Sequence, residues 1–290
     1  MELVKELFGS VARLRDFAPG IELAGDLSEY EAQAHLSKRE VERMVPGVWN
    51  SVISLAGDSP VRLCLLSALA NHIMSKMVTF SAVANRKNGS GDIFKYEVES
   101  MRRTYQDNYY NSLGDLLFSL QSEPPLQSLW ADSQWGRLLA SAEIKTTMEF
   151  NSLFPIDFSH LFFFRSLVLQ QEILMMGMAN IFARVRKAEA QDPEREQYGA
   201  SLSRLRLALA KRVVAMAMER FDPIELPTPI RNFFDDNNSS RSFGDVATLI
   251  AKFRQDADSI VSSVETVLSK GQGIVAATHF KKDDKIVFLA

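Results

Sequence analysis

The chain has one cysteine, Cys64, in 290 residues. A single cysteine excludes an intramolecular disulfide framework and a cysteine-rich zinc site. Histidine is also scarce: the 4 histidines occupy separate segments, and none has a second His or Cys at metal-ligand spacing. With only 14 Gly and 10 Pro, the chain is poorly suited to a loop-rich all-β fold or to disorder. The net charge of -3 does not require nucleic acid or an anionic membrane as a partner of the whole protein.

Targeting and catalytic motifs are missing as well. Residues 1–8 are amphipathic and acidic, without the basic start and unbroken apolar run of a signal peptide, so we expect a cytoplasmic protein, of a cell or of a host, that is not secreted. No nucleophile elbow, metalloprotease or dinucleotide-binding motif is present. Absent motifs are weak evidence against an enzyme, but they favour a non-catalytic protein and predict no cofactor.

The most apolar part of the chain is the stretch 161–182. Apolar residues fall on nearly every side of a helix drawn through it, which indicates a central helix buried on most of its circumference. Four polar residues interrupt the stretch, namely Arg165, Gln170, Gln171 and Glu172. A membrane span requires about 20 apolar residues with few or no charges, so we expect a buried core helix and no membrane span.

Helical periodicity, capping residues and Pro or Gly stops place the other elements. A short helix is expected over residues 2–17, and shorter helices over 126–139 and 142–150. Further helices are expected over 60–84, with Asp58 or Ser59 as the cap and Pro60 at the first helical position, over 93–120 with a possible break near Gly114, and over 157–190, 194–220 and 242–270. Two capping boxes, Ser28 with Glu31 and Ser37 with Glu40, predict short helices over 28–35 and 38–45. Residues 221–229 are proline-rich and predict an extended connector.

The tail changes to a period of two. Residues 274–280 and 285–289 flank a Lys-Lys-Asp-Asp turn, which predicts a β-hairpin. The expected fold is therefore mostly α: a multi-helix globular bundle of about ten helices around a buried central helix, with a small C-terminal β-hairpin. The expected division is a main helical domain over 1–222, a connector and polar loop over 223–241, and a C-terminal helix plus hairpin over 242–290, able to pack as one domain with the rest.

Basic and aromatic residues interleave in two regions, a pattern that supplies charge for phosphates and rings for base stacking. Residues 184–220 carry 9 basic and 5 acidic side chains, a local net charge of +4. The candidate nucleic-acid-binding residues are Arg102, Arg103, Tyr105, Tyr109, Arg184, Arg186, Lys187, Arg204, Arg206, Lys211 and Arg212. The alternative interpretation is that these are solvated faces of ordinary helices.

Two further features allow a structural and a functional interpretation. Asp235 and Asp236 supply the oxygen ligands that hard cations prefer, but they lack the ligand alternation of an EF-hand, so a solvated loop is the simpler interpretation. Methionines cluster in 175–178 and 216–218, either as adaptable core residues or as a pliable groove for a partner helix. His72 lies on an apolar helix and is interpreted as a core residue.

Three functions remain open on these grounds. The first is a non-catalytic interaction or assembly protein, a scaffold or subunit of a larger complex, whose hairpin tail contacts a protein partner or a second copy of the chain. The second is a nucleic-acid-binding protein of the nucleoprotein kind, which uses the two basic and aromatic regions. The third is an enzyme with an oxygen-ligand metal site at Asp235 and Asp236.

Overall fold

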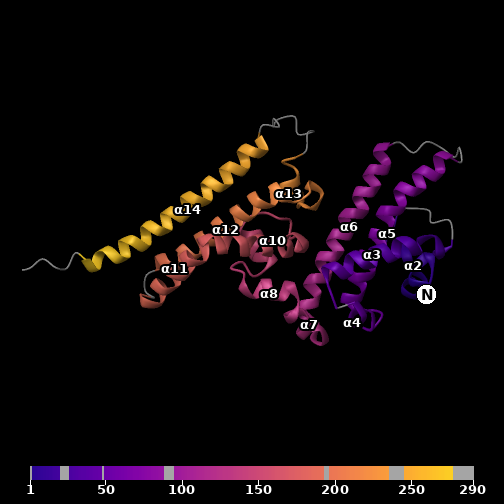
Figure 1. Cartoon of the computed structure of the whole chain (residues 1–290), viewed down its shortest axis with the longest axis horizontal. Coiled ribbons are helices and arrows are strands. Elements are labelled where there is room, and N and C mark those ends of the chain that lie inside the picture. The colour runs from indigo at the N-terminus through magenta and orange to yellow at the C-terminus, as the bar shows by residue number, and fades with distance from the viewer. Residues whose placement is uncertain are drawn as a thin grey trace, which may run out of the picture.

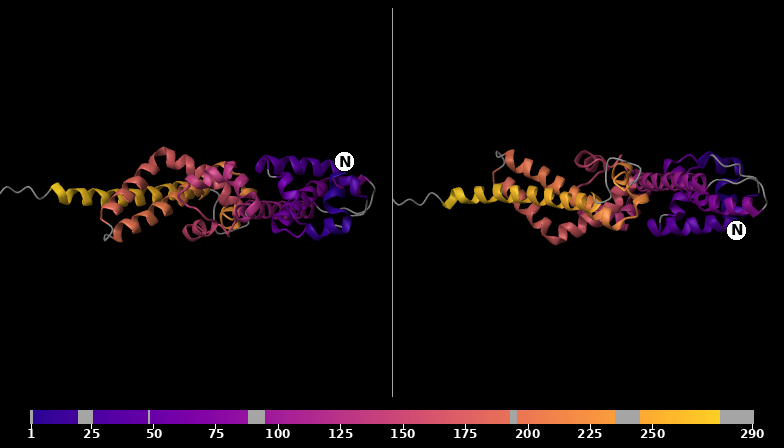
Figure 2. Two further views of the ribbon diagram at one scale, coloured as in Figure 1. Left: turned by 90° about the horizontal axis from the view of Figure 1, so that it is seen from below. Right: turned by 90° about the horizontal axis from the view of Figure 1, so that it is seen from above.

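A computed structural model describes residues 2–19, 26–47, 49–87, 95–192, 196–234 and 245–276. All regular elements in these ranges are helices, which confirms the mostly α fold. The molecule is elongated (Figure 1): α1 to α6 form one end, α7, α8 and α10 lie in the middle, and α11, α12 and α14 form the other end. The two views of Figure 2 show the same long, narrow body from below and from above.

The first end of the molecule is built around two long helices, α5 and α6, which pack against each other as a hairpin. Its elements are α1 (Leu3–Phe8), α2 (Val11–Phe17), a 3₁₀ turn η1 (Leu27–Tyr30), α3 (Glu31–Met44), α4 (Trp49–Ile53), α5 (Pro60–Lys87) and α6 (Lys95–Ser122). The predicted start of α5 at Pro60 is confirmed, as expected for Pro at the first helical position. The predicted single helix over 2–17 is wrong, because Gly9 at φ +71° ends α1 and Ser10 caps α2.

Both capping-box predictions are also wrong. A 3₁₀ turn and one continuous helix, α3, replace the two short helices. The hydroxyl of Ser37 donates to the Gln33 carbonyl inside α3 instead of capping a helix start. The Glu31 carboxylate accepts hydrogen bonds from the backbone N–H groups of Leu3 (2.9 Å) and Val4 (2.8 Å), so it caps α1 from another helix.

Gly114 does not break α6. Helix α6 continues through this position, and the predicted break is absent because the glycine serves a close helix contact. A Cβ atom built on Gly114 would lie 2.5 Å from the backbone nitrogen of Leu161, in the first turn of α10. Only a residue without a Cβ lets the two backbones approach this closely.

The second part of the chain continues from α6 through a series of shorter helices. Its elements are η2 (Pro124–Leu126), α7 (Gln127–Asp132), α8 (Gln134–Ser141), α9 (Thr147–Leu153), α10 (His160–Ile173), η3 (Leu174–Met178), α11 (Ala179–Gln191), α12 (Glu196–Arg220), η4 (Pro223–Glu225), α13 (Thr228–Arg231) and α14 (Asp245–Ala276). The proline-rich connector is thus not simply extended, since it forms the turns η4 and α13 and buries Leu226 and Ile230.

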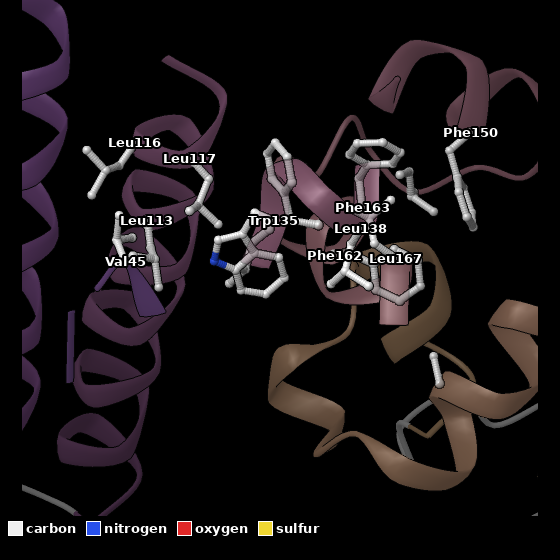
Figure 3. Close-up of a cluster of buried hydrophobic side chains, with 14 of the residues drawn as sticks. Val45, Leu113, Leu116, Leu117, Trp135, Leu138, Phe150, Phe162, Phe163 and Leu167 are labelled. Atoms are coloured by element: carbon white, nitrogen blue, oxygen red, sulfur yellow. The ribbon is translucent and has the colours of Figure 1, made fainter. Parts of the chain in front are cut away.

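The two halves of the molecule meet in one hydrophobic core (Figure 3). Trp135 of α8 lies between the leucines of α6 and the phenylalanines of α10. Its indole nitrogen donates to the Met44 carbonyl at the end of α3, at 2.6 Å, and its ring meets Phe164 edge-on. Phe162 and Phe164 are fully buried, so α10 is the buried central helix that the composition predicts.

The central helix is interrupted near its middle. Residues Leu174–Met178 form a single π-helical turn, and Gly177 adopts φ +118°, which divides the predicted helix 157–190 into α10 and α11. Met178 is buried there, whereas Met175 and Met176 are among the most exposed large apolar side chains. The methionine cluster therefore does not form one continuous core stripe.

Helix α14 runs antiparallel to α12 and also contacts α11 (Figure 1). Its buried face repeats at helical spacing and consists of Ile250, Ala257, Val261, Val264 and Leu268. The helix continues to Ala276, past the end predicted at 270. The first predicted hairpin strand begins at Ile274, and residues 274–276 are helical, so this part of the hairpin is not supported. The rest of the predicted hairpin, 277–290, lies outside the described residues.

Two described helical stretches, Pro60–Phe80 and His160–Gln191, are long and apolar enough to cross a membrane by length and composition alone. In each, 61% of the apolar window is buried inside the fold. The core helices of soluble proteins pass the same test, so these stretches are weak evidence of a membrane span. The expectation that the chain has no membrane span stays a prediction.

Candidate functional site

The two candidate aromatic residues of the first basic region, Tyr105 and Tyr109, are not available for base stacking. Tyr105 is buried, and its hydroxyl donates to the Pro19 carbonyl at 2.9 Å. Tyr109 is also buried, and its ring stacks on the ring of His72 with centroids 4.4 Å apart. Arg102 and Arg103 both bind the carboxylate of Glu99, one turn earlier on α6. The region is thus partly structural, although its arginines remain at the surface.

In the second basic region, most cations neutralise acidic residues of neighbouring elements. The pairs with α14 are Arg184–Glu265 (3.7 Å), Lys211–Asp256 (2.6 Å) and Arg212–Asp258 (2.6 Å), and the pairs with residues near α9 are Arg186–Glu143 and Arg206–Glu149. Arg204 and Lys187 are exposed and have no ion-pair partner among the described residues. The local charge of +4 therefore does not form an open basic groove, because α14 covers much of that face with acidic side chains.

A polar groove lies beside α6, where the two halves of the molecule meet. Two adjoining cavities define it. The inner cavity has a volume of about 310 Å³, and the outer cavity about 500 Å³. The inner cavity lies between α3, α5, α6, α10 and η4, and the outer cavity lies between α6 and the segment 222–234. Gln106, Tyr110 and Glu225 line both cavities, and we call the pair the α6 groove.

A buried histidine and a half-exposed glutamate are among the residues that line the inner cavity. His72 of α5 is 3% exposed, and its Nε2 lies 3.1 Å from the Oε2 of Glu40 on α3. Burial lowers the pKa of His72 to about 4, a net value in which Glu40 opposes the effect of burial and Lys76 adds to it. The imidazole is therefore neutral at pH 7. Because a carboxylate can only accept, Nε2 carries the proton and Nδ1 keeps its lone pair.

The tyrosines beside His72 are also held neutral. Burial raises the pKa of Tyr109, and the nearby Glu40 carboxylate adds to this effect. Burial likewise raises the pKa of Tyr110, with a further contribution from Glu225. Both phenols therefore keep their protons at neutral pH and can donate hydrogen bonds to a molecule in the groove.

Ion pairs hold the wall of the groove that η4 and α13 provide. Arg165 of α10 lies 2.6 Å from the carboxylate of Glu225. Arg231 of α13 binds both carboxylate oxygens of Asp107 on α6, at 3.2 and 3.0 Å. These partly buried pairs connect segments far apart in the chain, so the shape of the groove depends on the tertiary fold.

Three residues that line the groove each have a buried polar atom without a hydrogen-bond partner among the described residues; one is the Nη1 atom of Arg165, which lies 2.6 Å from Glu225 as an ion pair. The Nδ1 atom of His72 and the Oε1 atom of Gln106 are both buried, and neither has a partner in the described part of the chain. Both are acceptors in this arrangement, and a buried acceptor without a donor is costly.

The structure offers no metal centre in the ranges that it describes. No group of three or more His, Cys, Asp or Glu side chains there could hold a metal ion. The candidate ligands Asp235 and Asp236 lie outside the described residues, so the oxygen-ligand metal site stays a hypothesis.

Sequence patterns indicated only part of this site. Arg102, Arg103 and Tyr109 were candidates and line the groove, while Tyr105 points elsewhere. Gln106 and Tyr110 lie one and two turns after Arg102, and this i, i+4, i+8 spacing could have added them. Glu40 and Arg165 could not have been found this way, because they come from other helices.

Comparison of the chain with models of protein families, with curated proteins and with solved structures finds no match.

Proposed function

We propose that the chain is a helical interaction protein, a scaffold or subunit of a larger complex, and that it engages its partner through the α6 groove. The observation that carries this proposal is the pair of adjoining cavities of about 310 and 500 Å³ around Gln106 and Tyr110. Their volumes fall in the range of ligand sites.

Binding explains the groove better than catalysis does. The Glu40–His72 pair resembles the base and orienting carboxylate of a hydrolase, but a general base is most effective when its pKa lies near the working pH. A histidine with a pKa of about 4 is a weak base at neutral pH. A neutral, rigidly stacked imidazole is better suited to recognising a bound group.

Site-specific photo-cross-linking in the cell that makes the protein tests the proposal. A photoreactive residue in place of Arg103, whose side chain is 63% exposed at the outer cavity, should give a discrete adduct. The same residue in place of Lys187, exposed on α11, is the matched control and should give none. A doubling of the chain mass would identify a second copy as the partner. Equal labelling at both positions, or none at either, would contradict the proposal.

Nucleic-acid binding is the second candidate, and one observation favours it. The predicted candidates Arg102 and Arg103 line the same outer cavity as Tyr110, so two cations and one partly exposed ring lie together. A nuclease-sensitive adduct at position 103 would favour this candidate over a protein partner.

The C-terminal tail remains a separate proposed contact. Residues 277–290, predicted as part of a hairpin, lie outside the described residues. Light scattering on a sizing column, for the full chain and for a chain ending at Ala276, tests it. The same mass for both would exclude the tail as an assembly contact.

A further inference from the structure

An apolar helix face is left exposed where η3 continues into α11. Met175 and Met176 of η3 are 77% and 70% exposed, the two highest values among the large apolar side chains that the structure describes. Ala179 and Ala183 of α11 are exposed as well and continue the same side of the helix at helical spacing. Helices α12 and α14 contact α11 (Figure 1), but they leave these four side chains uncovered, and we call them the outer face of α11.

A cation follows the apolar residues along this face. Lys187 lies one turn beyond Ala183, is exposed, and has no ion-pair partner among the residues that the structure describes. The outer face thus presents two methionines, then two alanines, then a positive charge. A segment that covers it in the opposite direction must carry the complementary order, an acidic group followed by an apolar run.

The C-terminal tail of the chain has this order. Asp283 and Asp284 precede the apolar run 286–289, which reads Ile-Val-Phe-Leu. An extended chain would separate Asp284 from Phe288 by about 13 Å, and the rise of a helix separates Lys187 from Ala179 by about 12 Å. The distance between charge and apolar group is therefore the same on the tail as on the outer face.

The end of α14 brings the tail within reach of this face. Helices α11 and α14 both run antiparallel to α12 (Figure 1), and Glu265 meets Arg184 at 3.7 Å. From that pair, Ala276 lies about 16 Å further along α14, and Lys187 lies about 5 Å further along α11. The chain must then return by about 12 Å and cross about 10 Å to α11, whereas the residues from Ala276 to Asp283 can span about 23 Å.

We propose that the tail folds back on its own chain and covers the outer face of α11, with its acidic pair beside Lys187 and the run 286–289 over the methionines. A tether this short gives an effective concentration of about 1 mM, so a contact with a Kd of only about 0.1 mM would be about 90% occupied. Tethering therefore favours the same chain over a second copy as the source of the tail. The outer face is a different surface from the α6 groove, so the inference does not rest on the proposed function.

The exposed methionines measure the contact directly. Hydrogen peroxide oxidises the thioether of an accessible methionine to the sulfoxide, and peptide mass spectrometry gives the rate at each residue. In the purified full chain, Met175 and Met176 should be oxidised about 10-fold more slowly than in the variant Phe288→Asp, which places a charge in the apolar run. Met148 of α9, which is 66% exposed, is the internal control and should be oxidised at the same rate in both proteins. Equal rates at Met175 and Met176 in the two proteins would overturn the inference.

Two further full-length variants test the order of the contacts. Phe280→Asp makes the same change before the acidic pair and should keep the protection of the methionines. Lys187→Glu places a like charge beside Asp283 and Asp284 and should reduce the protection about 3-fold. An equal loss of protection in Phe280→Asp and Phe288→Asp would overturn the inference, as would full protection in Lys187→Glu.

Dilution distinguishes the same chain from a second copy. Protection within one chain should be equal at about 1 µM and about 100 µM protein, because the effective concentration of a tethered segment does not change on dilution. Protection that disappears at the lower concentration would assign the tail to a second copy, the assembly contact proposed above, and would overturn the inference. A cross-link from position 187 to the tail of the same chain adds no mass, so position 187 stays a valid control for position 103. The inference and the proposed function therefore fail separately.

Discussion

The buried histidine of the α6 groove makes the stability of the protein depend on pH in a way that can be calculated. The unperturbed pKa of a histidine is 6.5, and burial lowers that of His72 to about 4 in the folded chain. Between these two values the unfolded chain binds a proton that the folded chain does not. The contribution of His72 to stability is therefore fully present above pH 6.5 and is lost as the pH falls toward 4.

The size of the effect follows from the two pKa values. One pKa unit corresponds to 1.36 kcal/mol, so about 2 kcal/mol of unfolding free energy is lost by pH 5 and about 3 kcal/mol by pH 4. The perturbation is His72→Gln, which removes the titrating ring but keeps a polar side chain beside Glu40. Loss of the stacking contact with Tyr109 lowers the stability of this variant at every pH, so the pH dependence is the quantity to compare.

Urea unfolding followed by circular dichroism at pH 7, 6 and 5 measures it. The wild type should lose about 2 kcal/mol more between pH 7 and pH 5 than His72→Gln does. The matched control is His35→Gln, since His35 is a histidine of α3 with a 53% exposed side chain, and it should follow the wild type. The same loss in His72→Gln and in the wild type would refute the reasoning, and so would an NMR titration of His72 centred near pH 6.5.

Two further predictions concern packing, both measured by urea unfolding. Gly114→Ala should destabilise the protein by about 1–3 kcal/mol, because the new Cβ would lie 2.5 Å from the Leu161 nitrogen. The control Gly199→Ala, whose new Cβ would have its nearest contact at 3.6 Å, should be neutral or should stabilise by up to about 1 kcal/mol. Equal effects of the two substitutions would contradict the close contact between α6 and α10. Ala257→Asp should lower the free energy of unfolding by about 3 kcal/mol or more, because it places a charge against α12. The control Asp258→Ala removes a 63% exposed side chain and should lower it by less than about 1 kcal/mol. If Ala257→Asp left the stability unchanged, α14 would not pack on α12 as described.

The sequence by itself determined the helical character of the chain and the position of its core. The apolar stretch of α10 and the Pro60 start of α5 are local signals, because helix periodicity and the fixed φ of proline act within a few residues. The scarcity of glycine and proline points to the same fold class. These features require no knowledge of which element packs against which.

The tertiary structure decided the roles of individual side chains. Glu31 and Glu40 both have the spacing of a local capping box. In the structure, Glu31 caps α1 and Glu40 contacts His72 of α5, because each carboxylate binds a partner from another element instead of the start of its own helix. Gly114 suggested a break and instead allows α10 to approach α6. Lys211 and Arg212 of α12 suggested part of an open basic surface and instead pair with acidic residues of α14.

The same reason explains why the groove could not be predicted. Its walls come from α3, α5, α6, α10 and the segment 222–234. Only α6 supplies a series of polar side chains at helical spacing, and each of the other elements contributes one to three charged or polar side chains from a distant part of the chain. Burial then gave these side chains their properties, since desolvation lowered the pKa of His72 and raised that of Tyr109. Local sequence determines which helices form, but only packing determines which charged and polar groups meet and how far water is kept from them.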